Sequence, residues 1–406
     1  MSYSVSQLKS EVVAMLHTTS PARITNFNGA IYRAARQVLQ DVDPLETVRL
    51  ISMDAPISQD VYEYMCPADL KADRVVDIRP TGNRPPSATY NQGYSEAFDR
   101  NKQQGRQSNP FTIQWKNGVK TIRINTSLGT APVNVNPLES LTQNGAWAGT
   151  ITNLVQDGVF FVGDQYSIRG TLPSALTSAY IENSTMTAAD LSDYVSTGYI
   201  TLNAFVTDAS KIASIEVRLG SGDTNYYVGS ATQTAESTPF QNGWNLIRIA
   251  FNDCAQVGGV TASSIVYARI TVNYSAIVTD MIVRFNILNA SLGIGHEMLY
   301  YSKYLFRSPA GTFQEIITSS DDSELINLDT DSYNLLVYQA ALQCVQQNIP
   351  LDNQNDFQWI GTKYVETKDR YIANVKSQAK RTISSYYDMN QNSSTDLWGT
   401  GYSNYN

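Results

Sequence analysis

Apolar residues recur at helical spacing near the amino terminus of the chain. Residues 5–16 carry one apolar stripe after Ser4, a suitable N-cap. A second stripe runs through 27–39 and stops before Pro44, because a residue that precedes proline rarely stays helical. These stripes predict a pair of short helices.

The same spacing returns near the carboxyl terminus. An apolar stripe over 335–349 follows capping residues at 329–331 and ends at Pro350. A second stripe covers 357–379, and the positions between its apolar residues are charged, as on a solvated helix face. Residues 391–406 are rich in Asn, Ser, Gly and Tyr and predict an extended tail.

Between these ends the pattern is that of strands. Residues 111–115 and 121–125 alternate on either side of Asn117-Gly118, which suits a two-residue hairpin turn. Residues 80–110 are rich in Pro, Asn, Gln, Gly and Ser and predict an extended arm. Many runs of β-branched and aromatic residues, separated by turn residues, predict an antiparallel β-sandwich of the jelly-roll type. The sandwich runs lie at 159–162, 166–172, 179–181, 199–206, 214–219, 226–228, 244–251, 267–274 and 281–285.

The size of the chain fits more than one domain. At 406 residues, of which 42% are hydrophobic, it exceeds one ordinary core. We expect an α+β multidomain fold in which 1–142 and 291–390 form a helical domain with short β elements. An antiparallel β-sandwich at 143–290 interrupts this domain, an arrangement that requires the helices of both ends to pack together.

The net charge limits the possible partners. A formal charge of -8 argues against a protein that holds phosphate backbones over its whole surface, since this needs a basic footprint. The first residues lack the basic and apolar segments of a secretory signal, and no apolar run is long enough to span a bilayer. We expect a soluble protein with no membrane partner.

The sequence offers little for catalysis. The two histidines, His17 and His296, have no recognisable partner, and no hydrolase or nucleotide-binding motif stands in its usual context. The three cysteines lie far apart and signal neither a zinc site nor a disulfide framework. A glycosidase pair made by Glu182 or Glu216 is the catalytic alternative, although most such acids are turn residues. We expect no enzyme and no cofactor.

A calcium site is a weaker alternative. Asp157, Asp164 and Asp280 lie in adjoining predicted loops and offer the oxygen ligands that hard cations prefer. No loop motif supports this site, so ordinary turn acids are the simpler interpretation.

Aromatic residues of the sandwich are candidates for glycan contact, because exposed rings stack on sugars. The candidates are Trp147, Tyr226 and Tyr227. Since Tyr226 and Tyr227 are neighbours in a predicted strand, one should face inward and one outward. Trp244 alternates with Leu246 and is therefore assigned to the core.

The two ends of the chain resemble a known family. IYRAA at 31–35, DPLET at 43–47 and DVYEYMCPADL at 60–70 resemble the opening of tailed-phage head-to-tail connector (adaptor) proteins. The stretches 335–347 and 364–387 resemble the helix pair that ends such adaptors. The middle of the chain, with NGAW at 144–147, FQNGWN at 240–245 and MIV at 281–283, resembles a carbohydrate-binding-module jelly roll, which small adaptors lack.

The resemblance implies a structural virion protein in the phage neck, assembled in the host cytoplasm. Its partners would be copies of itself in a ring of about twelve, the portal protein and the next tail component, while DNA passes through without specific binding. The closing helices would supply assembly residues unless their stripe is simply core; these residues are Leu335, Tyr338, Leu342, Tyr364 and Tyr371. The alternative function is a virion-surface carbohydrate-binding or decoration module.

Overall fold

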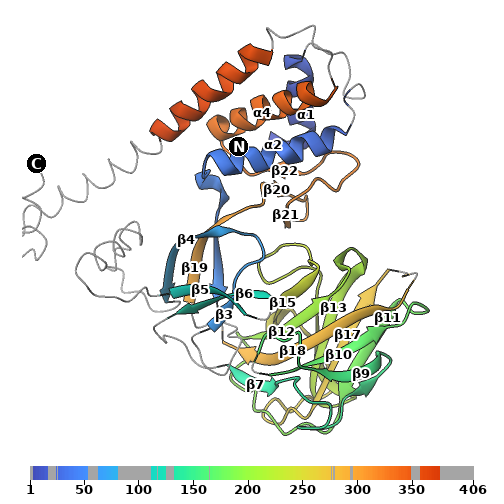
Figure 1. The fold of residues 1–406 in the computed structure, drawn as a ribbon. Helices are drawn as coiled ribbons and strands as arrows, with labels where there is room; N and C mark the ends of the chain where they lie inside the picture. The colour runs from blue at the N-terminus through green and yellow to red at the C-terminus, as the bar shows by residue number, and fades with distance from the viewer. Residues whose placement is uncertain are drawn as a thin grey trace, which may run out of the picture. The chain divides into compact units, whose positions relative to one another are not determined.

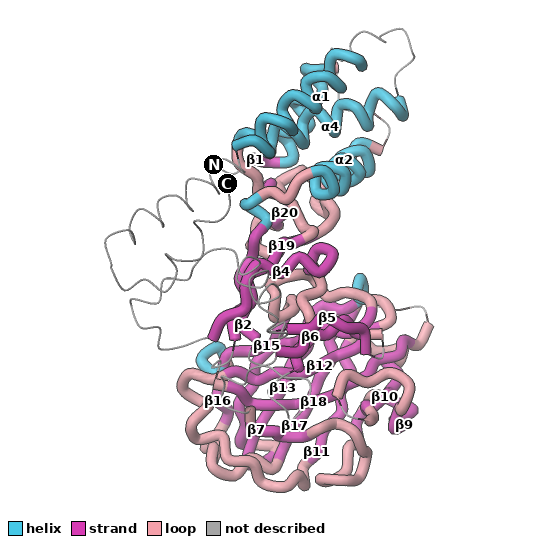
Figure 2. Tube along the Cα trace, turned by 60° about the vertical axis from the view of Figure 1, so that its left-hand side comes forward, coloured by secondary structure: helices cyan, strands magenta, loops and turns pink. Residues whose placement is uncertain are grey.

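The computed structural model divides the chain into two compact units. It describes residues 3–16, 24, 26–53, 63–80, 111–116, 118–124, 132–163, 165–275, 277, 279–292, 296–348 and 357–374. The helical unit comprises Met1–Thr47, Leu305–Pro309 and Glu315–Asn406, and the β unit comprises Val48–Tyr304 and Ala310–Gln314. Figure 2 shows the long helices in the first unit and most strands in the second. The chain is thus mostly β-sheet, with helices contributed by its two ends.

The amino-terminal segment forms two helices of the helical unit (Figure 1). α1 (Val5–Met15) starts after Ser4, whose hydroxyl accepts a hydrogen bond from the backbone N–H three residues on at 3.1 Å. α2 (Phe27–Asp41) starts after Asn26, whose side-chain oxygen accepts the equivalent N–H at 3.2 Å. Both helices lie where the apolar stripes predict them.

The carboxyl-terminal segment adds two more helices. α4 (Thr330–Asn348) begins after Asp329, whose carboxylate accepts the backbone N–H of Ser332 at 2.9 Å. A further helix covers 357–374 and buries residues at alternating spacings of four and three, namely Ile360, Tyr364, Thr367 and Tyr371. No described helix is long and apolar enough to cross a membrane.

α4 supplies the centre of the helical unit. Its buried side chains point in several directions and comprise Tyr333, Leu335, Leu336, Val337, Ala340, Ala341 and Cys344. They share one core with buried residues of α1, α2 and the helix at 357–374. A helix that is apolar on most sides is stable only when neighbours cover it. The two ends of the chain therefore fold as one body.

Short strands fix the first residues of the chain to this body. β1 (Tyr3–Ser4) and β20 (Phe306–Arg307) both pair antiparallel with β22 (Leu325–Ile326). The ring of Tyr3 stacks on that of Tyr333 in α4, with centroids 3.7 Å apart.

The chain enters and leaves the β unit through neighbouring strands. β2 (Val48–Met53) follows directly on the helical unit, and β19 (His296–Ser302) comes just before the chain returns to it. The two strands pair antiparallel, from Met53 opposite His296 to Val48 opposite Tyr301. The two ends of the β unit thus lie side by side, which is the geometry that allows one domain to interrupt another.

Two small sheets share a core next to these ends. β4 (Leu70–Pro80) pairs with β19, and β6 (Val119–Ile124) lies between β3 (Glu63–Met65) and β5 (Phe111–Lys116). Lys116 pairs with Val119, so the predicted two-residue hairpin turn is confirmed. Gly118 has a φ of 78° there, a conformation that glycine adopts without strain.

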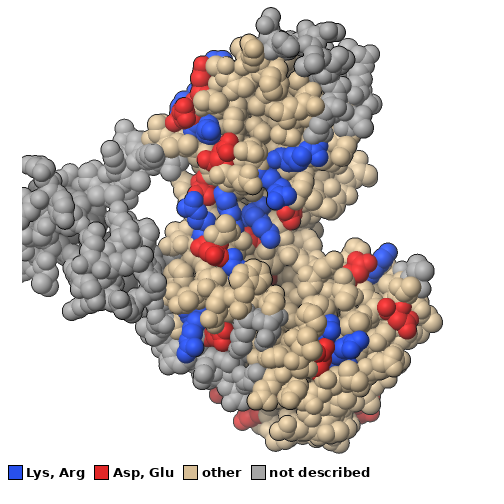
Figure 3. All heavy atoms as spheres, viewed as in Figure 1, with Lys and Arg blue, Asp and Glu red and all other residues tan. Residues whose placement is uncertain are grey.

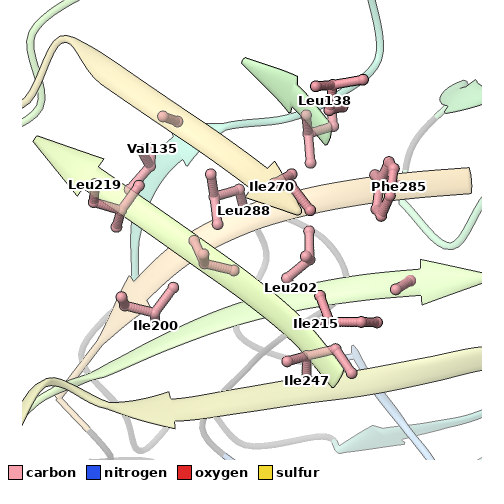
Figure 4. Close-up of a cluster of buried hydrophobic side chains, with 14 of the residues drawn as sticks. Val135, Leu138, Ile200, Leu202, Ile215, Leu219, Ile247, Ile270, Phe285 and Leu288 are labelled. Atoms are coloured by element: carbon pink, nitrogen blue, oxygen red, sulfur yellow. The ribbon is translucent and has the colours of Figure 1, made fainter. Parts of the chain in front are cut away.

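The rest of the β unit is an antiparallel β-sandwich. In the described residues, one sheet has the order β15-β12-β18-β10-β9 with β7 paired to β18, and the other has the order β16-β14-β13-β17-β11-β8. Apolar side chains from both sheets meet in one core (Figure 4).

The strands of the sandwich are β7 (Val133–Asn136), β8 (Ala148–Gly149), β9 (Thr152–Asp157), β10 (Ser167–Leu172), β11 (Ser178–Asn183), β12 (Tyr199–Val206), β13 (Ile212–Gly222), β14 (Asn225–Ala231), β15 (Gly243–Ala250), β16 (Ala255–Val257), β17 (Tyr267–Tyr274) and β18 (Met281–Ser291). Single-turn helices lie at η2 (Leu45–Thr47), η3 (Ala209–Lys211) and η4 (Phe251–Asp253), and β21 (Phe313–Gln314) belongs to the β unit.

The structure places the domain boundary elsewhere than expected. The sandwich begins before residue 143, because β7 pairs with β18 and Val135 and Leu138 lie in its core. The small sheets group with the sandwich and not with the helices. The arm at 80–110 lies outside the described residues except for Pro80, and the tail at 391–406 lies wholly outside them.

The segment 159–162 is a loop and not the predicted strand. The carboxylate of Asp157 accepts the backbone N–H groups of Val159 at 2.8 Å and Phe160 at 3.3 Å. Such a side-chain turn replaces the pairing of a strand with a local bond. The ladder therefore ends with β9.

A hydrogen bond between the helix at 357–374 and the last residue of α2 links the two ends of the chain. The buried Tyr364 donates to the carboxylate of Asp41 at 2.6 Å. We predict that Tyr364→Phe lowers the free energy of unfolding by about 1–2 kcal/mol, because the bond to a charged partner is lost. Urea denaturation followed by circular dichroism measures this change. Tyr338→Phe, which removes the same atom from a half-buried ring, is the control, and equal effects of the two variants would contradict the prediction.

Glu46 makes the helical unit sensitive to pH. Burial is the largest influence and, with the neighbouring Asp329, raises the pKa of the Glu46 carboxyl from 4.5 to about 7. Between these values the folded protein keeps a proton that the unfolded chain has lost, so stability falls as pH rises through this window. We predict that Glu46→Gln flattens the dependence of the urea midpoint on pH. Parallel pH profiles for the two proteins would refute this role.

Candidate functional site

The helix at 357–374 presents exposed apolar side chains. Phe357 is 37% exposed, Trp359 52% and Val365 49%. The Trp359 ring meets Tyr338 of α4 edge to face, with centroids 6.5 Å apart. Trp359 is thus a large exposed aromatic side chain that packs on α4 by one edge.

An open pocket of about 430 Å³ lies beside Trp359, and we call it the helical pocket. α1, α4 and the helix at 357–374 each contribute to it. Its lining residues are Glu11, Ala14, Met15, Asn334, Val337, Tyr338 and Trp359. Apart from Glu11 and Asn334 this lining is apolar, which suits the apolar face of a helix from another molecule.

The structure separates the five predicted assembly residues into two groups. Leu335, Tyr364 and Tyr371 are buried in the core of the helical unit, so their side chains stabilise that unit and do not reach a partner. Tyr338 and Leu342 keep partial exposure on α4. Of these five residues, Tyr338 alone lines the helical pocket.

The three predicted glycan contacts do not form an open aromatic platform. Trp147 is only 5% exposed, and Tyr227 packs edge to face on Phe251 against the sandwich core. Tyr226 faces the other side of the sheet, as the alternation of the strand predicts, where the guanidinium of Arg218 lies 4.9 Å from its ring centroid. Arg218 therefore already packs on the one ring of the three that faces outward.

Both candidate catalytic acids take part in ion pairs, Glu216 within its own strand and Glu182 with a neighbouring strand. Glu216 accepts from Arg218 at 2.8 Å, and Glu182 accepts from the Tyr267 hydroxyl at 3.1 Å and lies 3.9 Å from Arg269. Glu182 on β11 and Glu216 on β13 are separated by β17, and two strand spacings amount to roughly 10 Å. They resemble surface ion pairs more than the close carboxylates of a glycosidase. In the view of Figure 3, most of the surface of the β unit is formed by residues other than Lys, Arg, Asp and Glu.

The two calcium candidates that the structure describes have other partners. The carboxylate of Asp157 pairs with Arg284 at 2.8 Å, and that of Asp280 accepts the backbone N–H of Ser174 at 2.9 Å. Asp164 lies outside the described residues. Within the described part of the chain, no three His, Cys, Asp or Glu side chains are grouped so as to hold a metal ion.

A buried ion pair joins the small sheets to the sandwich. Asp69 is fully buried, and its carboxylate accepts hydrogen bonds from Arg49 at 2.5 Å, Tyr300 at 2.8 Å and Ser302 at 2.6 Å. Arg49 also donates to the backbone carbonyl of Glu236, which lies between β14 and β15. One guanidinium thus neutralises a buried charge and holds a loop of the sandwich beside β2.

A second pocket, of about 330 Å³, lies beside this loop within the β unit, and we call it the β pocket. It is formed by the loop and the start of β15, the turn before β4, the β5–β6 hairpin and Lys303. The lining residues are Met65, Cys66, Pro67, Ala68, Leu70, Trp115, Gly118, Val119, Lys120, Thr234, Glu236, Gln241, Asn242, Gly243, Trp244, Asn245, Leu246 and Lys303. Its lining combines aromatic, amide, carboxyl and ammonium side chains.

Trp244 lies outside the sandwich core, contrary to the prediction from its alternation with Leu246. In β15 the buried Ile247 and Ile249 point into the sandwich core, so Trp244, Leu246 and Arg248 lie on the opposite face. Trp244 packs instead against a small cluster that includes Val119 of the hairpin. Arg248, two positions beyond Leu246, is the signal in the sequence that this face is not the core.

Comparison with known proteins identifies no family for this chain. No protein-family model matches it, and no curated protein does. Among solved structures, the family 30 carbohydrate-binding module of a cellulosomal cellulase of Clostridium thermocellum is similar at 12% identity and a TM-score of 0.28, over 41% of this chain and 95% of that one. Carbohydrate-binding modules of the β-sandwich superfamily are similar at 10% identity and a TM-score of 0.28, over 60% of this chain and 96% of theirs.

An exo-β-agarase is also similar, at 8% identity and a TM-score of 0.28. The match covers 39% of this chain and 25% of the agarase, so this chain spans only a part of that enzyme. At such identities and TM-scores the likeness carries no conclusion about function.

The ion pair with Arg49 stabilises the buried carboxylate of Asp69 in the folded β unit. We predict that Arg49→Met lowers the free energy of unfolding of the β unit by about 3–5 kcal/mol, because it leaves a buried carboxylate without its cation. Urea denaturation followed by tryptophan fluorescence measures the loss. The double variant Arg49→Met, Asp69→Asn should recover part of it. If the double variant is less stable than the single one, the ion pair is not the cause.

Proposed function

We propose that this protein is a structural subunit of the head-to-tail connector type in a tailed-phage particle. It assembles through its helical unit into a ring of about twelve copies that binds the portal protein on one side and the next tail component on the other. In this role it carries out no reaction of its own. The observation that carries the proposal is the shared core of the two chain ends, which makes one helical body interrupted by the β unit.

The surface of the helical body supports assembly. Trp359 and Tyr338 lie beside an apolar pocket, and both residue types are common at the energetic centres of protein interfaces. Tyr32 and Arg36 of α2 add a cation–π pair with the guanidinium carbon 5.7 Å from the ring centroid. A patch that binds a different patch on the next copy produces a closed ring when the rotation between copies closes.

The charge of the chain suits a channel for DNA. The formal net charge is -8, and like charges keep a polyanion from adhering to the wall of a passage. A ring subunit that bound phosphates firmly would slow the passage of the genome.

Mass photometry of the full-length protein, alone and with the portal protein of the same phage, tests the assembly. We predict a species of about twelve chains in at least one of these samples. Trp359→Ala should reduce the assembled fraction at least fivefold, because the indole side chain forms part of the proposed contact surface. The melting temperature should change little, since this side chain is 52% exposed.

Trp115→Ala is the matched control, because Trp115 is 72% exposed on the β unit. A protein that stays monomeric both alone and with the portal would refute the proposal. Equal loss of assembly in the two tryptophan variants would refute the assigned surface.

A further inference from the structure

The helical pocket is lined by apolar side chains and by one carboxylate. Glu11 is its charged lining residue, and the Glu11 carboxylate accepts from the side-chain amide of Gln7 at 3.1 Å. Among the described lysines and arginines, none forms an ion pair with Glu11. A partner that carries a cation next to an apolar side chain therefore complements this pocket.

One segment of the chain itself has this combination of side chains. Apolar residues recur every four positions from Val375 to Ile383, a spacing typical of one helix face. Residues 375–387 contain no acidic side chain, whereas the whole chain has a formal net charge of -8. The segment is thus complementary in charge to the remainder of the protein. Its basic residues are Lys376, Lys380 and Arg381.

The pocket of the same copy is poorly placed for this segment. Trp359 lines the pocket near the start of the last described helix, and Asn374 ends that helix about 22 Å away at 1.5 Å per residue. The residues from 375 to 379 span at most about 18 Å, even when fully extended. A segment that turned back could therefore not bring Ala379 into its own pocket, whereas the pocket of a second copy has no such limit.

We infer that residues 375–387 of one copy bind in the helical pocket of the next copy. Ile383 enters between the apolar walls, and Lys380 meets the carboxylate of Glu11. These two residues of the segment are three positions apart, so in a helix they project to the same side. The apolar contact supplies most of the binding energy, and the cation favours this segment over acidic ones.

This contact specifies the partner in the proposed assembly and rests on that proposal for the presence of neighbouring copies. The donor segment follows the helix at 357–374, whereas α1, α4 and the start of that helix form the acceptor pocket. Because donor and acceptor are different surfaces, each copy binds the next in one direction, and the series can close into a ring.

Disulfide trapping in the full-length protein tests the inference. One preparation carries Met15→Cys in the pocket, and another carries Ile383→Cys in the segment. Both also carry Cys254→Ala, because Cys254 is partly exposed whereas the other two cysteines are buried. After mixing and mild oxidation, we predict a disulfide-linked dimer on a non-reducing gel, since the bond forms only when the two Cα atoms come within about 7 Å.

Gln40→Cys is the matched control for the pocket. Gln40 is exposed on α2 of the same helical unit and does not line the pocket. Mixed with the Ile383→Cys protein, it should give at least about tenfold less linked dimer, because no binding raises the local concentration there. Equal yields from Gln40→Cys and Met15→Cys would mean random collision and would overturn the inference.

A chain that carries both Met15→Cys and Ile383→Cys tests whether the segment binds its own copy. We expect links between chains, whose yield rises with protein concentration. If the link forms only within one chain, and the mixed single variants give no dimer, the inference is wrong.

The charge of Lys380 provides a second readout. Lys380→Glu in the Ile383→Cys protein should lower the yield of linked dimer about fivefold, since it places a second acid beside Glu11. With Glu11→Gln in the partner protein, the loss should be much smaller, because the repelling charge is gone. Glu11→Gln keeps the side-chain oxygen that accepts from Gln7. A yield that Lys380→Glu leaves unchanged contradicts the assigned contact.

Mass photometry of the same variants separates this inference from the proposed function. If rings form with the portal but no disulfide is trapped, the inference is wrong and assembly uses another contact. If the disulfide forms but no ring appears with or without the portal, the inference is supported and the proposed function is refuted.

Discussion

The burial of α4 is the constraint from which the arrangement of the chain follows. Its side chains at 335–337 and 340–341 are covered on several sides, and the covering helices come from both ends of the sequence. A helix with so little polar surface is not stable in water without them. The chain between the two ends therefore leaves the helical unit after Thr47 and returns to it at Leu305. The pairing of β2 with β19 meets this requirement, because it brings Val48 opposite Tyr301.

Within the β unit, a buried charge has a similar organising effect. The carboxylate of Asp69 is excluded from water and needs several donors, and Arg49 supplies the one that carries a charge. Because the same guanidinium binds the carbonyl of Glu236, the loop before β15 has a fixed place next to the turn that carries Asp69. The β pocket lies where these two segments face each other. The contacts of Arg49 with Asp69 and with the carbonyl of Glu236 thus help to fix the walls of this pocket.

The sequence predicts the parts of this structure that depend on local pattern. The cap at Ser4, the stripe through Ile360 and Tyr364 and the turn at Gly118 follow from residue type and spacing, and all are present. The face of Trp244 was missed, because alternation shows that two faces differ but not which one meets the core. The boundary at 143 was missed for a related reason, since the pairing of β7 with β18 joins residues that are far apart in sequence.

The two pockets differ in the kind of partner that their chemistry admits. Among the described residues that line the helical pocket, none has a buried polar atom without a partner, so the partner needs only an apolar surface that excludes water. The β pocket instead has a mixed lining, with polar residues such as Thr234, Asn245 and Lys303 beside its apolar and aromatic ones. The two pockets thus belong to separate units of the chain and differ in the chemistry of their linings.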